Sequence, residues 1–162
     1  MKQISLRKRY RLRSKEARKM MEDLSLNWGV HLDEDSQIDV GRLDDDRAFV
    51  MGGRIIAVED DKALYLTLHG IMLLEPDRSW VVVDMGAVRF LANGADVMAP
   101  GIVDADERIE EGDIVWVRDE VHGKPLIVGK ALMGGGEMKR ADSGKAISTI
   151  HFVGDPIWNA EL

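Results

Sequence analysis

Apolar positions near the start of the chain follow the period of an α-helix. Four apolar residues fall at positions i, i+3, i+4 and i+7 and so share one face of an amphipathic helix: Ala17, Met20, Met21 and Leu24. Ser14 is placed to cap the start of this helix, and Gly29 is placed to end it. The pattern therefore predicts one helix within residues 14–29, preceded by a strand over residues 4–10, where apolar and polar positions alternate.

The apolar runs that follow are shorter and favour β-strands. Residues 49–51 and 55–58 are apolar and flank Gly52-Gly53, a combination that predicts a β-hairpin. A further strand is predicted at residues 38–40. Residues 63–74 fit both a helix and a strand, because their leucines satisfy either period.

Residues 80–103 combine a strand, a short helix and a second strand within a few residues. Residues 81–83 are three valines, which predict a buried strand, and Asp84 can cap the helix that follows. Helical spacing over residues 88–92 ends at Asn93-Gly94, where both residues tolerate a left-handed backbone. Residues 95–99 predict another strand, which Pro100-Gly101 ends. Two adjacent small residues, Gly86-Ala87, leave room for a ligand or another backbone.

Short strands separated by glycines continue to the C-terminus. Strands are predicted at residues 114–117, 125–133 and 146–153, with a helical turn at residues 138–143. The triple glycine at residues 134–136 predicts a mobile hairpin or linker. This spacing favours a small barrel, and the polar, proline-containing residues 75–79 form the best domain boundary.

The residues from Asp84 onward resemble the PUA domain, an RNA-binding pseudobarrel named from pseudouridine synthases and archaeosine transglycosylases. Its pattern has an acidic residue, Gly-Ala, a short helix, Gly-Ala and an apolar strand ending in Pro-Gly. Here these are Asp84, Gly86-Ala87, residues 88–92, Gly94-Ala95 and residues 97–101. Residues 144–158 are similar to the C-terminal end of one subgroup. That subgroup contains the malignant-T-cell-amplified translation factors, the N-terminal half of ligatin-type initiation factors and their single-chain archaeal relatives.

This resemblance implies an α+β fold with two domains. Residues 1–75 would form an N-terminal α/β pre-PUA domain with a basic arm and a helix, and residues 76–162 a mostly β PUA pseudobarrel. The resemblance is specific over residues 80–162 and rests mainly on the order of elements over residues 1–75. It also favours a helix within residues 63–74.

The resemblance further implies that RNA lies against the glycine-rich helix and the last strands. The residues carried over as RNA-binding are Gly86, Ala87, Arg89, Phe90, Gly94, Ala95, Asp96, Val97, Met98 and Lys145. Phe90 could stack on a base and Arg89 could contact phosphate, since single-stranded RNA exposes both. Core packing for Phe90 and an ordinary surface charge for Arg89 remain open alternatives.

Charge is distributed unevenly along the chain, whose net charge is −7. Residues 1–20 carry nine Lys or Arg and one Glu, whereas residues 80–162 carry eight basic and fourteen acidic residues. Such asymmetry indicates nucleic-acid contact by the basic end. A basic arm formed by Arg7, Lys8, Arg9, Arg11 and Arg13 is therefore predicted to contact phosphates. A solvated tail and helix face is the alternative.

The chain offers little that would support catalysis, a cofactor or a metal. It has no cysteine, its four histidines are scattered, and no G-x-S-x-G motif occurs. The acidic residues 33–46 lack the glycine and glutamate positions of a calcium loop, and the triple glycine lacks the spacing of a phosphate-binding loop. We expect no enzymatic activity, no cofactor and no metal. No apolar run approaches the length of a membrane span, so a cytoplasmic protein is expected.

Three functions remain open. The first is a non-catalytic RNA-binding protein in translation, which recognises the acceptor end of tRNA, small-subunit rRNA or both during initiation or recycling. Its partners would be RNA and a second translation initiation factor. The second is an accessory RNA-binding subunit for an RNA-modifying enzyme, in tRNA or rRNA pseudouridylation or the archaeosine pathway. The third is a scaffold that binds only proteins through its acidic face.

Overall fold

The structure is a computed structural model that describes residues 2–162. The described chain divides into two compact units, one formed by residues 2–77 with residues 154–162 and the other by residues 78–153. Sequence reasoning assigned all of residues 76–162 to the second domain. The last nine residues instead pack with the first unit.

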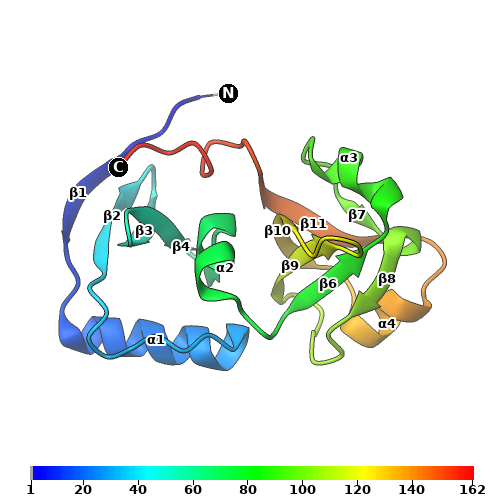
Figure 1. Ribbon diagram of the computed structural model, residues 1–162, viewed down its shortest axis with the longest axis horizontal. Helices are drawn as coiled ribbons and strands as arrows, with labels where there is room; N and C mark the ends of the chain where they lie inside the picture. The colour runs from blue at the N-terminus through cyan, green and yellow to red at the C-terminus, as the bar shows by residue number, and fades with distance from the viewer. Residues whose placement is uncertain (1) are drawn as a thin grey trace. The chain divides into compact units, whose positions relative to one another are not determined.

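The first unit is built on a five-stranded antiparallel sheet in the order β1-β2-β3-β4-β5 (Figure 1). Its strands are β1 (Leu6–Arg11), β2 (Asp39–Leu43), β3 (Asp46–Met51), β4 (Arg54–Glu59) and β5 (Leu64–Leu66). The predicted hairpin is present as β3 and β4, with Gly52 and Gly53 in the left-handed region at φ 59° and 76°. The basic residues predicted to form an arm lie mostly on β1, which is the edge strand paired with β2.

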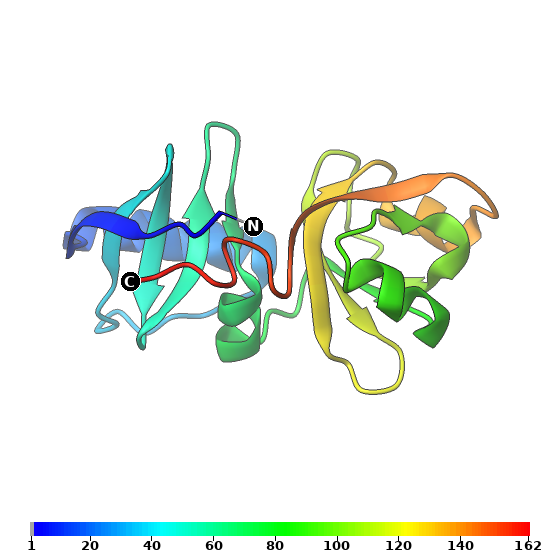
Figure 2. The same ribbon diagram turned by 90° about the horizontal axis from the view of Figure 1, so that it is seen from above.

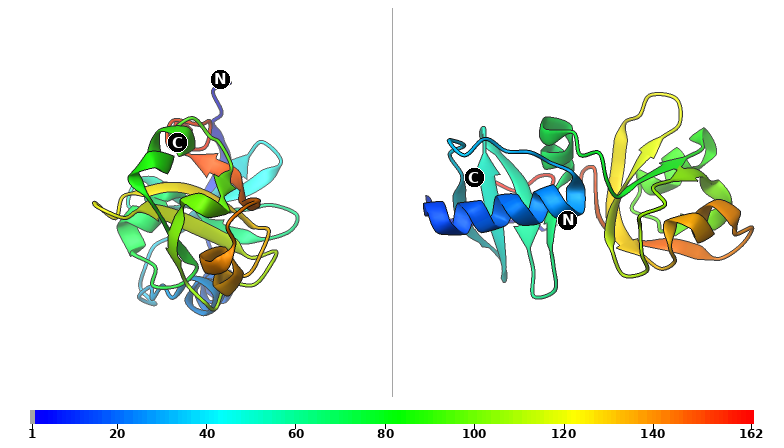
Figure 3. Two further views of the ribbon diagram at one scale, coloured as in Figure 1. Left: turned by 90° about the vertical axis from the view of Figure 1, so that its right-hand side faces the viewer. Right: turned by 90° about the horizontal axis from the view of Figure 1, so that it is seen from below.

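Helix α1 (Ser14–Trp28) covers one face of this sheet (Figure 3). Met20, Leu24 and Trp28 are buried at intervals of four residues, as the amphipathic pattern predicts. Gly29 ends the helix in the left-handed conformation, at φ 66°. Arg13 occupies the N-cap position without a side-chain hydrogen bond, so Ser14 begins the helix and does not cap it.

The ambiguous residues 63–74 contain both a strand and a helix. Strand β5 ends at Leu66, and α2 (Leu68–Leu74) begins immediately after Thr67. The Thr67 hydroxyl accepts from the Gly70 N–H at 3.0 Å and donates to the Ile55 carbonyl at 2.6 Å, which joins the helix start to β4. Helix α2 lies so close to β4 that a Cβ at Gly70 would overlap the Ile56 carbonyl oxygen.

The C-terminal residues run across the first unit on the side opposite α1 (Figures 2 and 3). Glu161 pairs with the chain just before β1, because its N–H donates to Ile4 at 3.0 Å and its carbonyl accepts from Leu6 at 2.7 Å. The rings of Trp158 and His69 stack with their centroids 4.0 Å apart. These contacts attach residues 154–162 to the first unit.

The second unit contains a six-stranded sheet in the order β7-β11-β10-β9-β6-β8. Its strands are β6 (Trp80–Val83), β7 (Val97–Met98), β8 (Ile102–Ala105), β9 (Ile114–Asp119), β10 (Pro125–Ala131) and β11 (Lys145–Phe152). Strands β6 and β9 are parallel, with Trp80 opposite Trp116, and the other pairs are antiparallel. Strand β8 was not predicted, because it follows β7 after only one 3₁₀ turn.

The sheet curls around an apolar core, which includes Val81, Leu91, Val115, Ile127 and Ile147, each no more than 1% exposed. The predicted α+β fold class is confirmed. The triple glycine is not a mobile linker, because Gly135 and Gly136 begin helix α4 (Gly135–Arg140). A Cβ at Gly135 would overlap the Asp106 carbonyl oxygen, so the close approach of α4 to the chain after β8 requires glycine there.

Candidate nucleic-acid interface

A loop and two short helices connect β6 to β7. Asp84 follows β6 and caps the 3₁₀ helix η1 (Met85–Ala87), since its Oδ1 accepts from the Ala87 N–H at 3.1 Å. Helix α3 (Val88–Leu91) continues from η1, and Gly94 turns the chain at φ 84°. The Asp84 N–H also donates to the Gly101 carbonyl at 2.9 Å, which joins the start of this connection to its end.

These elements enclose an open hollow of about 680 Å³, which we call the platform hollow. Most of the residues that line it are apolar or small, and the charged ones are two aspartates and one lysine. The lining residues are Asp84, Gly86, Ala87, Phe90, Leu91, Ala95, Asp96, Val97, Met98, Pro100, Gly101 and Lys145.

Eight of the ten residues predicted to bind RNA line this hollow. Arg89 and Gly94 do not. Gly94 instead packs against the Phe152 ring, which a Cβ at this position would approach to 2.7 Å. The lining residues that sequence reasoning missed include Asp84 and Gly101. Sequence reasoning assigned Asp84 as a helix cap and Gly101 as a turn, and both as part of the PUA pattern, but neither as an RNA-binding residue. In the structure the hydrogen bond between them shapes the wall.

Two apolar side chains of the hollow are exposed where a ligand could meet them. Phe90 is 54% exposed and Met98 is 50% exposed, so Phe90 is not a core residue. The Arg89 guanidinium lies over the Phe90 ring, 4.9 Å from its centroid. This cation–π contact holds Arg89 against the ring while leaving its charge at the surface.

Lys145 does not carry an isolated positive charge. Its Nζ lies 2.8 Å from an Asp96 carboxylate oxygen, and the other oxygen accepts from the Thr149 N–H at 2.8 Å. The hydrogen bond from Lys145, followed by that from Thr149, lowers the pKa of Asp96 below the ordinary aspartate value. With Asp84 also present, the charged residues that line the hollow sum to a net charge of −1.

Comparison with known proteins identifies this unit. The PUA domain family matches residues 79–153. An uncharacterized protein of Methanocaldococcus jannaschii is 46% identical, over 96% of this chain and 98% of that protein. Translation machinery-associated protein 20 of Saccharomyces cerevisiae is 30% identical, over 76% of this chain and 72% of the yeast protein. The solved structure of a conserved PUA domain protein from Thermoplasma acidophilum has a TM-score of 0.82 at 31% identity, covering 91% of this chain and 95% of that one.

The chain belongs to the PUA domain protein family. The resemblance carried by the glycine-rich segment is thereby confirmed. The platform hollow lies within the part of the chain that matches the PUA domain, whereas β1 and α1 lie outside it.

In the first unit of this PUA protein, the predicted basic residues fall into two groups. Arg9 and Arg11 both contact the Asp39 carboxylate, with nitrogen–oxygen distances of 2.8 and 2.6 Å. The hydrogen bond from Arg11, followed by that from Arg9, lowers the pKa of Asp39. Arg7, Lys8 and Arg13 are exposed and form no ion pair within residues 2–162. These three residues, here called the unpaired cations, are therefore available to phosphates.

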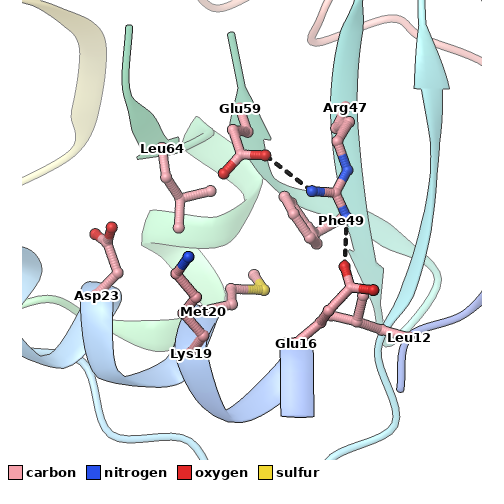
Figure 4. A pocket seen from close by; sticks show the side chains of 9 residues that line it. All are labelled: Leu12, Glu16, Lys19, Met20, Asp23, Arg47, Phe49, Glu59 and Leu64. Atoms are coloured by element: carbon pink, nitrogen blue, oxygen red, sulfur yellow. Dashed lines mark hydrogen bonds and ion pairs between the residues drawn. The ribbon is translucent and has the colours of Figure 1, made fainter. Parts of the chain in front are cut away.

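A second, smaller hollow lies between α1 and the sheet of the first unit (Figure 4). Its volume is about 160 Å³. Arg47 crosses it and pairs with Glu16 and Glu59, both at 3.0 Å, with its guanidinium 5.4 Å from the Phe49 ring centroid. These contacts connect α1 to β3 and β4, so we interpret this hollow as part of the packing of the first unit.

Within residues 2–162, no three His, Asp or Glu side chains are grouped so that they could hold a metal ion. Among the same residues, no helix is long and apolar enough to cross a membrane.

Proposed function

We propose that this PUA protein is a non-catalytic RNA-binding protein of the translation machinery, and that it holds the single-stranded acceptor end of tRNA in the platform hollow. The observation that carries the proposal is the hollow itself, with Phe90 and Met98 exposed in an apolar wall. The bases of a single-stranded end are unstacked, so their faces can lie against such side chains. Small residues at Gly86 and Ala87 give the RNA backbone room to approach.

The proposal assigns phosphate binding to a different part of the chain. The hollow has a net negative charge, so it contributes no long-range attraction for RNA. The unpaired cations on and beside β1 provide that attraction. Small-subunit rRNA is the second RNA that these cations could contact in the assembled translation machinery.

The name of the yeast relative supports the assignment to translation. We extend the proposal to a cytoplasmic protein that acts during initiation or recycling, together with a second initiation factor. No observation favours the alternative of an accessory subunit for an RNA-modifying enzyme.

Steric closure of the hollow tests the proposal. Ala87→Trp fills the hollow without changing charge, and Ala92→Trp is the matched control, since Ala92 is exposed and does not line the hollow. Binding is measured for tRNA with and without its 3′ end. We expect Ala87→Trp to abolish the preference for the intact end, while weak salt-sensitive binding persists.

Ala87 is half-buried against the core, so overpacking by Trp could destabilise the unit by about 1–3 kcal/mol. Phe90→Ala, at an exposed position, provides a second variant with little risk to folding. If folded Ala87→Trp and Phe90→Ala proteins both keep the preference for the intact 3′ end, RNA is recognised elsewhere and the proposal is wrong.

A further inference from the structure

The two carboxylates of the platform hollow differ in their hydrogen bonding. Both oxygens of Asp96 are engaged, one by Lys145 and the other by Thr149. Asp84 uses Oδ1 to cap η1 through the Ala87 N–H. Its Oδ2 receives no hydrogen bond from any group within residues 2–162. Asp84 therefore brings an unused, charged hydrogen-bond acceptor to the wall of the hollow.

The charge of the hollow restricts which part of an RNA end can enter it. A phosphate would meet two carboxylates and one lysine that is already paired. A neutral base would meet exposed apolar surface at Phe90 and Met98, together with the free acceptor of Asp84. The hollow therefore favours a base over a phosphate. A base that carries a hydrogen-bond donor would bind best, because it could donate to Asp84.

Bases differ in the donors that their edges carry. Adenine, cytosine and guanine each have an exocyclic amino group, which can donate to a carboxylate. Uracil has no exocyclic amino group, and its one edge donor, the N3–H, lies between two carbonyl oxygens that a carboxylate repels. A fixed carboxylate beside the base can therefore separate these two classes.

We propose that the Asp84 carboxylate selects RNA ends whose last base carries an exocyclic amino group. This rests on the proposed function, because it takes the platform hollow as the site that holds an RNA end. Asp84 thus has two roles: Oδ1 caps the helix that shapes the hollow, and Oδ2 accepts a hydrogen bond from the base. The cap fixes which oxygen is free, since Oδ1 is committed to Ala87.

The experiment compares short single-stranded RNAs that end in adenine or in unsubstituted purine, which differ only in the amino group. A hydrogen bond to a charged acceptor corresponds to a preference of about tenfold for adenine. A second pair, ending in cytosine or uracil, is expected to show the same direction. Affinities of the 162-residue protein are measured by fluorescence anisotropy at one fixed salt concentration.

Asp84→Asn is the informative variant, because asparagine caps helices as well as aspartate does. Its amide oxygen can keep the bond to Ala87, and its amide nitrogen, a donor, then replaces Oδ2. We expect the preference for adenine over purine to fall to about twofold or less. Asp104→Asn is the matched control, since it removes the same charge from β8 outside the hollow and should leave the preference unchanged.

The outcomes separate this inference from the proposed function. If Ala87→Trp blocks binding of these RNAs but the wild-type protein binds adenine and purine ends equally, the hollow holds RNA and Asp84 does not select the base. The same conclusion follows if a folded Asp84→Asn protein keeps the full preference. If Ala87→Trp and Phe90→Ala leave the binding of every probe unchanged, the proposed function itself fails.

Discussion

Replacing the unpaired cations Arg7, Lys8 and Arg13 together with alanine is expected to reduce the salt dependence of RNA binding. These residues are exposed and carry a combined charge of +3 that no ion pair offsets within residues 2–162. Arg9 and Arg11 share one carboxylate, that of Asp39. The two groups should therefore contribute unequally, although the sequence alone placed all five residues in one basic arm.

The size of the effect follows from counterion release. Each phosphate contact that is lost flattens the slope of log K against log salt by about 0.7–0.9. Loss of three contacts therefore flattens the slope by about 2–3. Arg9, Arg11 and Asp39 together carry a net charge of only +1, so they should displace about one counterion when RNA binds. Replacing Arg9 and Arg11 should therefore flatten the slope by about 1 at most.

The assay is a titration of labelled tRNA at a series of salt concentrations, followed by fluorescence anisotropy. A variant with Lys124, Lys130 and Arg140 replaced by alanine is the matched control, since it removes the same charge from exposed positions of the second unit. An unchanged slope for the variant lacking the unpaired cations would refute the assignment. Equal flattening by the control variant would mean that only total charge matters.

Three further predictions concern stability. Gly70→Ala should lower the free energy of unfolding by about 3 kcal/mol or more, measured by urea denaturation, because its Cβ overlaps the Ile56 carbonyl oxygen. Asp106→Asn should lower the free energy of unfolding by about 2 kcal/mol at neutral pH in the same measurement, because the buried carboxylate accepts hydrogen bonds from Arg108 and Ser79. Trp158→Ala should release the C-terminal residues, which hydrogen exchange would detect as faster exchange of the Glu161 amide.

The pH dependence of the Asp106 effect has a definite sign. Burial raises the pKa of Asp106, but the hydrogen bonds from Arg108 and Ser79 outweigh it and hold the pKa below the ordinary value. The stabilisation is thus complete above the unfolded-state pKa of about 3.9 and is lost as the pH falls through the lower folded-state pKa. A difference between wild type and Asp106→Asn that stays constant down to the lowest pH would contradict this account.

Suitable controls exist for the other two variants. A Cβ added by Gly53→Ala would meet open space. This variant should lower the free energy of unfolding by only about 1 kcal/mol, because residue 53 has a left-handed backbone. If Gly70→Ala is no more destabilising than Gly53→Ala, α2 does not depend on close contact with β4. For Trp158→Ala, the Ala131 amide in the second unit should keep its exchange rate, and an unchanged Glu161 rate would mean that the stacked rings do not hold the C-terminus.

The sequence predicted those parts of the fold that depend on local chemistry. Gly29 ends α1 and Gly52-Gly53 turn the β3–β4 hairpin, since each supplies a left-handed backbone. The short helix after Asp84 followed from the cap and from the spacing of Val88 and Leu91. Each of these features is determined within a few residues, so it can be seen in the chain alone.

The features that sequence reasoning missed depend on long-range contacts. The start of α4 at Gly135 is set by its packing against the Asp106 carbonyl, which lies far away along the chain. Pairing of Glu161 with Ile4 joins nearly the two ends of the chain. The neutralisation of Lys145 by Asp96 likewise required strands β7 and β11 to be adjacent. No pattern of neighbouring residues in the sequence indicates such contacts.

The same contacts change the interpretation of the site. In sequence, Lys145 was a candidate RNA-binding residue, and residues 80–162 were net acidic. In the structure that acidity reaches the hollow through Asp84 and Asp96, while the unpaired cations lie in the first unit. Electrostatic attraction of the RNA and recognition of its last base can then be measured separately. Added salt should weaken the affinity for every RNA, because it screens the phosphates. The ratio of affinities for adenine and purine ends should stay constant, because a short hydrogen bond at Asp84 is screened far less.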